Sequence, residues 1–373
     1  MTTPDVLVVV VTHNSGRAID AFASAMLAEL DDTHALVVVD NASTDDTVAR
    51  VRARLPAATV LEPGRNLGYG AAVNLAFATV RPRESMLVAN PDTVLHPGAL
   101  SRLRDVLRPA VGIAVPRLVE PDGTLAPSLR RAPSLLRAAG ESVLGGLRAG
   151  RVAGLGEIVC NPAEYAQPRT VDWATGAAWL VTTRCFDALG GFVEDYFLYS
   201  EETDFALRAR DRGFATVYVP DAVVTHEGGA SNVDPALFAL LTRNRVRCYG
   251  RRHHAPATLA FRLTLLAGEL ARAGAGRATS RAAVRALIGD TRVLPAAALT
   301  SEYDTRRSAA HRGGGPTKTV RLRPSRHEGR DPRGWSREPV GRGDRDPTQA
   351  AHRDRRTADP VAHHEALCPP RAS

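Results

Sequence analysis

The hydrophobic pattern of residues 5–116 alternates between short apolar runs and segments with helical spacing. The apolar runs are typical of strands buried on both faces of a parallel sheet, and we expect them at Val6–Thr12, Ala35–Val39, Thr59–Leu61, Met86–Ala89 and Ile113–Pro116. Helical spacing lies between them, in Ser15–Leu30, from Ser43 or Thr44 to Leu55, in Ala71–Val80 and in Gly98–Arg108. Four repeats of strand and helix predict an α/β domain with a doubly wound, mostly parallel sheet and helices on both faces.

The pattern changes after residue 116. Residues 117–167 are irregular and are expected to form an excursion over one face of the sheet. A helix headed by acids is expected at Tyr196–Gly213, followed by strands at Thr216–Val219 and Ala222–Thr225, and the helical spacing then continues in Pro235–Tyr249, Ala255–Ala273 and Ala282–Ile288. From Thr305 onward apolar residues are too sparse to offset the entropy of ordering, so we expect a disordered tail.

Polar residues stand directly after the fourth expected strand, at Asn90-Pro91-Asp92. Ligands of parallel α/β sheets bind beyond the carboxyl ends of the strands, so Asp92 is expected where a hard cation and a phosphate could meet. The same three residues are also typical of an ordinary turn before the next helix, near His96-Pro97-Gly98. Both interpretations are open at this point.

The net charge of +8 is concentrated at the end of the chain. From Thr305 onward there are sixteen Lys or Arg and eight Asp or Glu, so the residues before it are neutral. A basic tail of this kind is one route to a nucleic-acid-binding protein. The neutral body gives no reason to expect a specific nucleic-acid partner.

Several classes of protein are excluded by missing patterns. No apolar run reaches the length of a membrane span, and Val6–Val11 lacks the basic leader of a signal peptide. The four cysteines are scattered without a C-x-x-C pair, which fits neither zinc nor a disulfide framework and favours a cytoplasmic location. Asp40 would suit a dinucleotide-binding domain, but Thr12–Gly16 holds one glycine where G-x-G-x-x-G is needed, and there is no phosphate-binding G-x-x-x-x-G-K-[ST] loop.

The motifs at the strand ends together resemble the inverting glycosyltransferase family 2, and within it bacterial rhamnosyltransferases that act on polyprenyl diphosphate sugars. The resemblance covers residues 5–250 and rests on Thr12-His13-Asn14, Asp40-Asn41-Ala42-Ser43-Thr44-Asp45, Arg65-Asn66-Leu67-Gly68-Tyr69-Gly70, Asn90-Pro91-Asp92, Thr175-Gly176-Ala177-Ala178 and Gly191–Arg208. It implies a GT-A fold, a nucleotide diphosphate sugar as donor, a divalent metal (Mg²⁺ or Mn²⁺) and a cell-envelope glycolipid or polysaccharide precursor as acceptor.

The resemblance also implies residue roles. Asp92 would bind the metal with His226, and Glu202 or its neighbour Glu201 would be the general base. The donor would contact Thr12, Asn14, Asp40, Asn66, Gly68, Asn90 and Asp92, and the acceptor would contact Trp173, Thr175 and Gly176. Asn90 stands where the family's DxD motif has its first acid, which also leaves open a protein that binds a nucleotide sugar without turnover.

Structural explanations compete for the same residues. Ser200 followed by acids is a good helix start, and Asp204 with Arg208 is an ordinary i,i+4 pair. Trp173 and Trp179 are equally expected in a core, and a histidine at a strand end is often structural. Arg243, Arg245, Arg247, Arg251 and Arg252 suit either a solvated helix face or contact with diphosphate or anionic lipid.

The expected reaction needs the base because a sugar hydroxyl is a poor nucleophile until its proton is removed. The N-terminus of its helix is expected to keep that carboxylate ionised. One displacement at the anomeric carbon then inverts its configuration.

The chain is expected to divide into three regions. We expect a GT-A domain at 1–230, with a nucleotide-binding half at 1–116 and an acceptor and catalytic half at 117–230, then a helical region at 231–300 and the tail at 301–373. The helices after Pro235 are expected to dock the cytoplasmic protein at the inner membrane leaflet.

Overall fold

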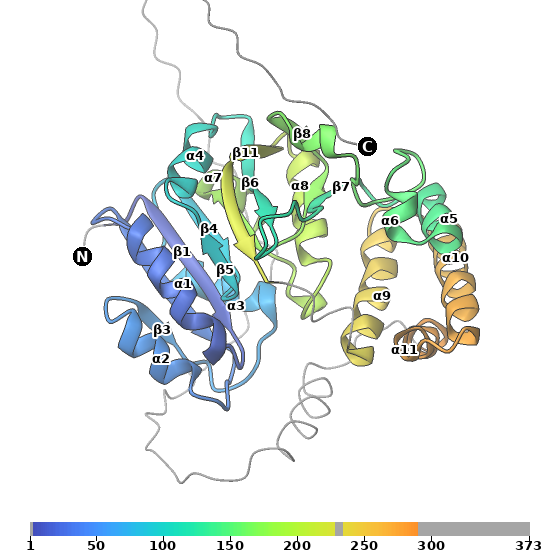
Figure 1. The fold of residues 1–373 in the computed structure, drawn as a ribbon, viewed down its shortest axis with the longest axis horizontal. Coiled ribbons are helices and arrows are strands. Elements are labelled where there is room, and N and C mark those ends of the chain that lie inside the picture. The colour runs from blue at the N-terminus through green and yellow to red at the C-terminus, as the bar shows by residue number, and fades with distance from the viewer. Residues whose placement is uncertain (1–2, 228–233, 290–373) are drawn as a thin grey trace, which may run out of the picture. The chain divides into compact units, whose positions relative to one another are not determined.

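The computed structural model describes residues 3–227 and 234–289 (Figure 1). By internal contacts the chain divides into residues 1–312 and 313–373, and every described residue belongs to the first unit. The expected tail at 301–373 therefore lies outside the described residues, as does the end of the expected helical region.

One nine-stranded sheet organises this unit, in the order β3-β2-β1-β4-β10-β6-β11-β5 with β8 paired to β11. Six strands (β1, β2, β3, β4, β6 and β11) run in one direction, which confirms a mostly parallel sheet. A separate two-stranded sheet joins β7 (Leu129–Arg130) to β9 (Trp173–Ala174). The large sheet comprises β1 (Val6–Thr12), β2 (His34–Asp40), β3 (Thr59–Leu61), β4 (Ser85–Ala89), β5 (Thr93–Leu95), β6 (Val111–Val119), β8 (Arg169–Val171), β10 (Ala178–Thr182) and β11 (Ala215–His226).

Helices cover both faces of the sheet because its central strands are apolar on both sides. In β1, Leu7 and Val9 pack with α3 (Tyr69–Thr79), α7 (Thr183–Leu189) and α8 (Glu201–Asp211). On the other face, Val8 and Val10 pack with α1 (Gly16–Glu29), α2 (Thr47–Arg54) and α4 (Ala99–Asp105). Two short 3₁₀ helices, Pro162–Tyr165 and Glu194–Tyr196, complete this part of the chain.

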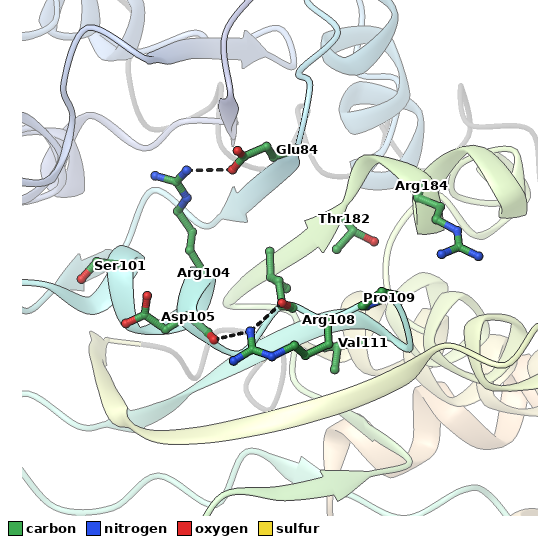
Figure 2. Close-up of a pocket in the computed structure, with 10 residues that line it drawn as sticks. Glu84, Ser101, Arg104, Asp105, Arg108, Pro109, Val111, Thr182 and Arg184 are labelled. Atoms are coloured by element: carbon green, nitrogen blue, oxygen red, sulfur yellow. Dashed lines mark hydrogen bonds and ion pairs between the residues drawn. The ribbon is translucent and has the colours of Figure 1, made fainter. Parts of the chain in front are cut away.

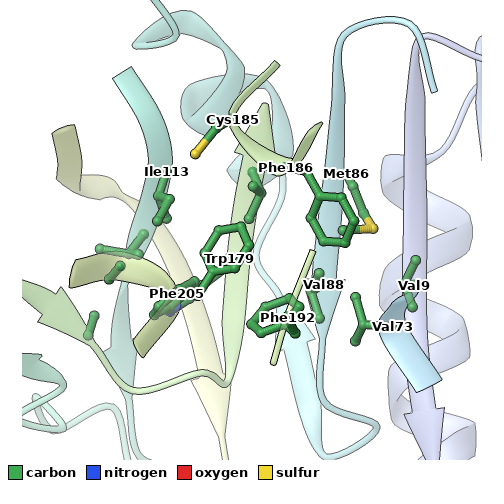
Figure 3. Packing of buried hydrophobic residues seen from close by; sticks show 14 of the residues in the cluster. Val9, Val73, Met86, Val88, Ile113, Trp179, Cys185, Phe186, Phe192 and Phe205 are labelled. Carbon is green, nitrogen blue, oxygen red and sulfur yellow. The ribbon is translucent and has the colours of Figure 1, made fainter. Parts of the chain in front are cut away.

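The core between the sheet and α8 is aromatic (Figure 3). The ring of Phe192 stacks on that of Phe205 with centroids 4.5 Å apart, and Phe186 lies 5.8 Å from Phe205. Trp179 on β10 is 2% exposed and belongs to the same cluster. This packing fixes α8 against the sheet, which matters because α8 carries the candidate base at its first turn.

Five further helices gather on the side of the unit away from β1–β3 (Figure 1). They are α5 (Leu135–Leu144), α6 (Gly146–Ala149), α9 (Pro235–Gly250), α10 (Ala255–Gly274) and α11 (Ala278–Ile288). A small core of Ala138, Val246, Tyr249, Phe261, Leu265 and Leu287 joins α5 to α9, α10 and α11. The irregular excursion of residues 117–167 thus contributes a helix to the C-terminal helical region. None of the described helices is long and apolar enough to cross a membrane.

Several expectations about the elements were wrong. Strand β10 runs antiparallel between β4 and β6, at a position where no strand was expected. The two strands expected at 216–225 are one strand, β11, with a register shift between Val219 and Val223. Asn90-Pro91-Asp92 does form a turn, but it opens β5 and not a helix.

Two helix starts also differ from the expected ones. Helix α2 begins after Asp46, because Ser43 is drawn to Asp40, whose carboxylate accepts hydrogen bonds from the Ser43 N–H (2.9 Å) and hydroxyl (2.6 Å). Helix α8 begins at Glu201 and not at Tyr196. Phe197, Tyr199 and Ser200 have φ values of 63°, 68° and 71°, which no helix permits, and the Ser200 side chain does not cap α8.

Candidate active site

A cavity of about 860 Å³ lies at the carboxyl ends of β4 and β11, between the sheet and the helical region. Residues far apart in the sequence share its wall. Those expected from the sequence are Asn90, Asp92, Trp173, Thr175, Gly176, Glu201, Glu202 and His226. The cavity also contacts the first turn of α8, the β7–β9 pair, α9 and α10.

Asp92 and His226 face each other at this site. The strand pairing of β5 with β11 places His226 opposite Thr93, and the His226 Nε2 lies 3.4 Å from the Asp92 Oδ1. Their side chains are 16% and 36% exposed, so both remain accessible from the cavity. One carboxylate and one imidazole suit Mn²⁺ or Mg²⁺ when substrate phosphates supply the remaining oxygens. Within residues 3–227 and 234–289, no group of three or more His, Cys, Asp or Glu could hold a metal ion alone.

Two adjacent carboxyl groups, Glu201 and Glu202, open α8 beside this pair. Glu201 is 3% exposed, and its Oε2 has no hydrogen-bond partner among the described residues. Burial, and next the charge of Glu202, raise the pKa of Glu201 well above its usual value. Burial also raises the pKa of Glu202, against the backbone N–H groups of Glu202 and Gly176 and the charge of Arg130. Desolvation thus opposes the effect of the helix N-terminus at Glu202, and the ionised state of this carboxylate stays a prediction.

The strained segment before α8 is held from two sides. The Asn244 side chain on α9 is 2% exposed, and its Nδ2 donates to the carbonyl oxygens of Tyr196 (2.8 Å), Leu198 (2.8 Å) and Tyr199 (3.2 Å). On the other side, the N–H of Tyr69 donates to the Phe197 carbonyl at 2.7 Å. Gly68, at φ 85°, allows this approach, since a Cβ there would lie 2.4 Å from the Phe197 oxygen. Such strain persists only where surrounding contacts determine the backbone.

The expected acceptor residues separate into cavity and core. Trp173 lines the cavity, with its Nε1 donating to the Arg131 carbonyl at 3.1 Å. Trp179 is a core residue, as its burial shows. Gly176 lies against Glu202, since a Cβ on it would meet the Glu202 side chain at 3.6 Å. Tyr69 closes this part of the wall, and burial raises its pKa, with further contributions from Glu201, Glu202 and Asp92.

The expected donor residues at the ends of β1, β2 and β3 do not line the described cavity. They form a hydrogen-bonded frame at the same edge of the sheet. The Thr12 hydroxyl donates to Asp40 at 2.8 Å, and the Asn14 Oδ1 accepts from the Thr44 N–H at 2.8 Å. The Asn66 Oδ1 accepts from the Gly68 N–H at 2.9 Å, so this loop leads directly into the wall at Tyr69.

Much of the arginine cluster of α9 is committed to internal pairs. Arg245 binds Glu141 and Glu157, both at 2.7 Å, and Arg247 binds Asp195 at 2.7 Å. Arg252 pairs with Asp211. These contacts fasten α9 to α5 and to the region before α8, which is a structural use of the cluster.

A second cavity of about 530 Å³ lies at the opposite edge of the sheet (Figure 2). Its lining includes Glu84, which directly precedes β4, and Val111, the first residue of β6. Two of its arginines are engaged within the chain, because Arg104 pairs with Glu84 at 2.7 Å and Arg108 donates to the Asp105 carbonyl at 2.7 Å. The third, Arg184, lies over the Phe214 ring at 5.6 Å from its centroid. It therefore offers no chemistry comparable with that of the first cavity.

Arg130, Tyr69 and Asn244 were missed as site residues by the sequence analysis. Tyr69 lies inside a quoted motif, and Asn244 is the one amide in a run of arginines, which is a usable signal. Nothing in the local pattern around Arg130 distinguishes it from Arg131.

Comparisons with known proteins show the family to which the chain belongs. Residues 4–251 match the family model described as glycosyltransferase like family 2. The chain is 34% identical over 248 residues to the N-acetylglucosaminyl-diphospho-decaprenol L-rhamnosyltransferase of Mycobacterium tuberculosis, covering 62% of this chain and 80% of that one. It is 24% identical over 221 residues to the low-salt glycan biosynthesis hexosyltransferase Agl10 of Haloferax volcanii, covering 55% and 62%.

The fold has known neighbours as well. The crystal structure of GalNAc-T7 with UDP, GalNAc and Mn²⁺ superposes with a TM-score of 0.53 at 11% identity, covering 83% of this chain and 58% of that one. At this identity the likeness concerns the fold alone, and it agrees with the GT-A fold expected from the sequence. The family match spans most of the chain and includes the cavity residues up to Cys248. This chain therefore belongs to glycosyltransferase family 2 and is a glycosyltransferase.

Proposed function

We propose that this glycosyltransferase moves a sugar, rhamnose in the first instance, from a nucleotide diphosphate to a lipid-linked cell-envelope precursor, with inversion. The observation that carries the proposal is the convergence of Asp92, His226 and Glu202 on one cavity. The relative from M. tuberculosis supports the choice of sugar and acceptor through its name.

Glu202 is the proposed general base. It lines the cavity and is only partly buried, whereas Glu201 is almost fully buried. Burial raises the pKa of both groups, and the charge of Glu202 raises that of Glu201 further, so Glu202 is the one proposed to ionise. Glu202 takes the proton of the acceptor hydroxyl, the oxygen bonds to the anomeric carbon, and the bond to the diphosphate breaks. The products are the inverted glycoside and a nucleoside diphosphate, and the proton passes from Glu202 to solvent.

Asp92 and His226 would hold the divalent metal, with Asn90 in reach of the donor. When bound, such an ion supplies positive charge that offsets the charge of the leaving diphosphate. The donor's nucleoside would lie over the frame of Thr12, Asn14, Asp40, Asn66 and Gly68, and the acceptor sugar over Trp173, Thr175 and Gly176. An indole face suits the apolar face of a sugar ring.

Contact with a membrane surface is part of the proposal. Ten of the eleven strongly exposed large hydrophobic side chains in the described residues lie at 135–152 and 259–288. On α10, Leu259, Leu263 and Leu270 face solvent while Phe261 and Leu265 face the helical core, so this helix is apolar on both sides. Exposed arginines flank these leucines, as expected for an anionic lipid surface at the cytoplasmic face.

Release of nucleoside diphosphate from a panel of nucleotide sugars, with and without acceptor and chelator, tests the function. A general base typically contributes about 10²- to 10⁴-fold, so Glu202→Gln is expected to lower kcat by that factor. Asp92→Asn is expected to remove metal-dependent turnover. The exposed residues Glu120 and Asp32 provide matched controls, as Glu120→Gln and Asp32→Asn.

The rival function is a protein that binds a nucleotide sugar without turnover, which Asn90 in place of an acid favours. Binding of donor without acceptor-dependent release of nucleotide would establish that rival. Full activity of Glu202→Gln would instead remove Glu202 from its proposed role.

A further inference from the structure

Arg130 is a cation in the wall of the active-site cavity that the proposed function does not use. It lies on β7, paired with Trp173 of β9, and its guanidinium is 5.9 Å from the Trp173 ring. Its Nη1 donates to the carbonyl oxygens of Pro127 (2.7 Å) and Leu129 (3.1 Å). Among the described residues, Nε and Nη2 have no hydrogen-bond acceptor.

Two other arginines of this cavity are neutralised by carboxylates, and a third, Arg277, is exposed to solvent. Arg245 pairs with Glu141 and Glu157, and Arg272 pairs with Glu269 at 2.7 Å. No carboxylate of the described chain lies within 4.0 Å of the Arg130 guanidinium. An arginine that is partly withdrawn from water without a counter-ion costs free energy, which a bound anion would offset.

The surroundings of Arg130 agree with a ligand. Burial lowers its pKa, yet a guanidinium stays protonated in proteins. The positive charge of Arg130 acts on Glu202 and opposes the rise in the pKa of Glu202 that burial causes. Arg130 therefore stands close to the reacting groups, on the two-stranded sheet that also carries Trp173.

We propose that Arg130 is the anion-binding residue of this cavity and that its ligand is the diphosphate of a substrate. The inference rests on the proposed function. Two substrates could supply the group: the nucleotide donor, and an acceptor whose sugar is attached to a lipid diphosphate. The shared chemistry is a diphosphate facing the free Nε and Nη2 edge of the guanidinium, and the position of Arg130 beside Trp173 favours the acceptor.

Calorimetric binding to the full chain tests the proposal with three probes. These are UDP and dTDP with Mn²⁺, an N-acetylglucosamine linked to farnesyl diphosphate, and the phosphate-free octyl glycoside of the same sugar. Losing a charge-assisted, two-point contact costs about 10- to 100-fold in affinity. Arg130→Met is expected to lower the affinity for the lipid diphosphate probe by this factor and to leave the affinity for the octyl glycoside unchanged. Arg130→Lys is expected to have an intermediate affinity for the lipid diphosphate probe. The exposed Arg151 gives the control Arg151→Met, which is expected to bind like wild type.

The arms separate the possible outcomes. A loss confined to UDP or dTDP assigns Arg130 to the donor and supports the proposal in that form. Unchanged binding of every diphosphate overturns it, and so does an equal loss for the lipid diphosphate and the octyl glycoside, which would make Arg130 a support of Trp173. This experiment measures binding and does not depend on turnover. A wild-type protein that binds the probes but never turns over the donor would contradict the proposed function, and the role of Arg130 could still be tested.

Discussion

The carboxyl group of Glu201 is buried in the site at a cost to the stability of the folded protein. It is almost fully buried, one of its oxygens has no partner among the described residues, and burial raises its pKa well above the ordinary value. A folded state that keeps a proton which the unfolded chain releases loses stability as pH rises above the unfolded pKa of about 4.5. Glu201 therefore destabilises the protein increasingly from pH 5 upward, which is expected of a site residue kept for function and not for stability.

Glu201→Gln is expected to remove this dependence. The variant should gain stability relative to wild type by up to about 1.4 kcal/mol per pH unit between pH 5 and the raised pKa of Glu201. Thermal unfolding of both proteins at several pH values measures the difference, with Glu120→Gln as the control. A constant difference across the pH range would contradict the assignment of the raised pKa to Glu201.

At the level of elements, the start of α8 depends on a side chain of α9 in the helical region. Asn244 on α9 donates to three carbonyl oxygens of the segment that leads into α8, where three residues have positive φ. The direction in which Glu201 and Glu202 enter the cavity is thereby set from the helical region. Asn244 is a positioning residue, since it reaches the site only through the backbone.

Asn244→Asp is expected to remove the hydrogen bonds to the segment before α8 in a pH-dependent way. An ionised aspartate would face three carbonyl oxygens, whereas a protonated one regains a single O–H donor. Activity relative to wild type should fall about 10- to 100-fold at pH 8 and recover as pH is lowered. The measurement is the ratio of the kcat of the variant to that of wild type at several pH values. The control is Asn161→Asp, because the Asn161 side chain accepts a hydrogen bond in the native protein and an aspartate can do the same. A ratio that does not vary with pH would indicate general damage to the fold.

The elements also show where prediction from sequence succeeds. Strands such as Val6–Thr12 were predicted because a continuous β-branched run has few other uses. The resemblance assigned Asp92, His226 and Glu202 to one site, and the three do line one cavity, while their roles stay predictions. The antiparallel place of β10 between β4 and β6 was not predicted, because strand order depends on contacts between distant residues. Arg130 and Asn244 were missed for the same reason: each acts through segments that only the folded chain brings near.

At the scale of the whole described unit, exposed leucines are concentrated on the helical region. Exposed apolar side chains gathered on one region would suit contact with a bilayer if, as proposed, the acceptor is lipid-linked. Helices α5 and α6, which carry part of these side chains, come from residues 117–167, which were expected only to form an excursion over one face of the sheet.

Leu136→Ser combined with Leu147→Ser tests this surface, since both side chains are more than 60% exposed. Each leucine that enters lipid contributes on the order of 1 kcal/mol, so the pair is expected to lower the partition coefficient about 30-fold. Co-sedimentation of the full chain with vesicles rich in anionic phospholipid measures it. Leu27→Ser, on α1 and 60% exposed, is the control. Equal binding by all three proteins would assign vesicle attachment to another part of the chain.

The antiparallel strand β10 has a consequence for synthesis. One edge of β4 pairs with β1, and the other pairs with β10 at residues 178–182. During synthesis the second edge stays unpaired until residues 90–177 have left the ribosome. A nascent chain halted anywhere in that interval presents a bare, apolar strand edge, which invites pairing with other chains. We therefore expect fragments ending near residue 116 to associate with chaperones or aggregate, and a fragment extended past residue 182 to be the shortest that hides this edge.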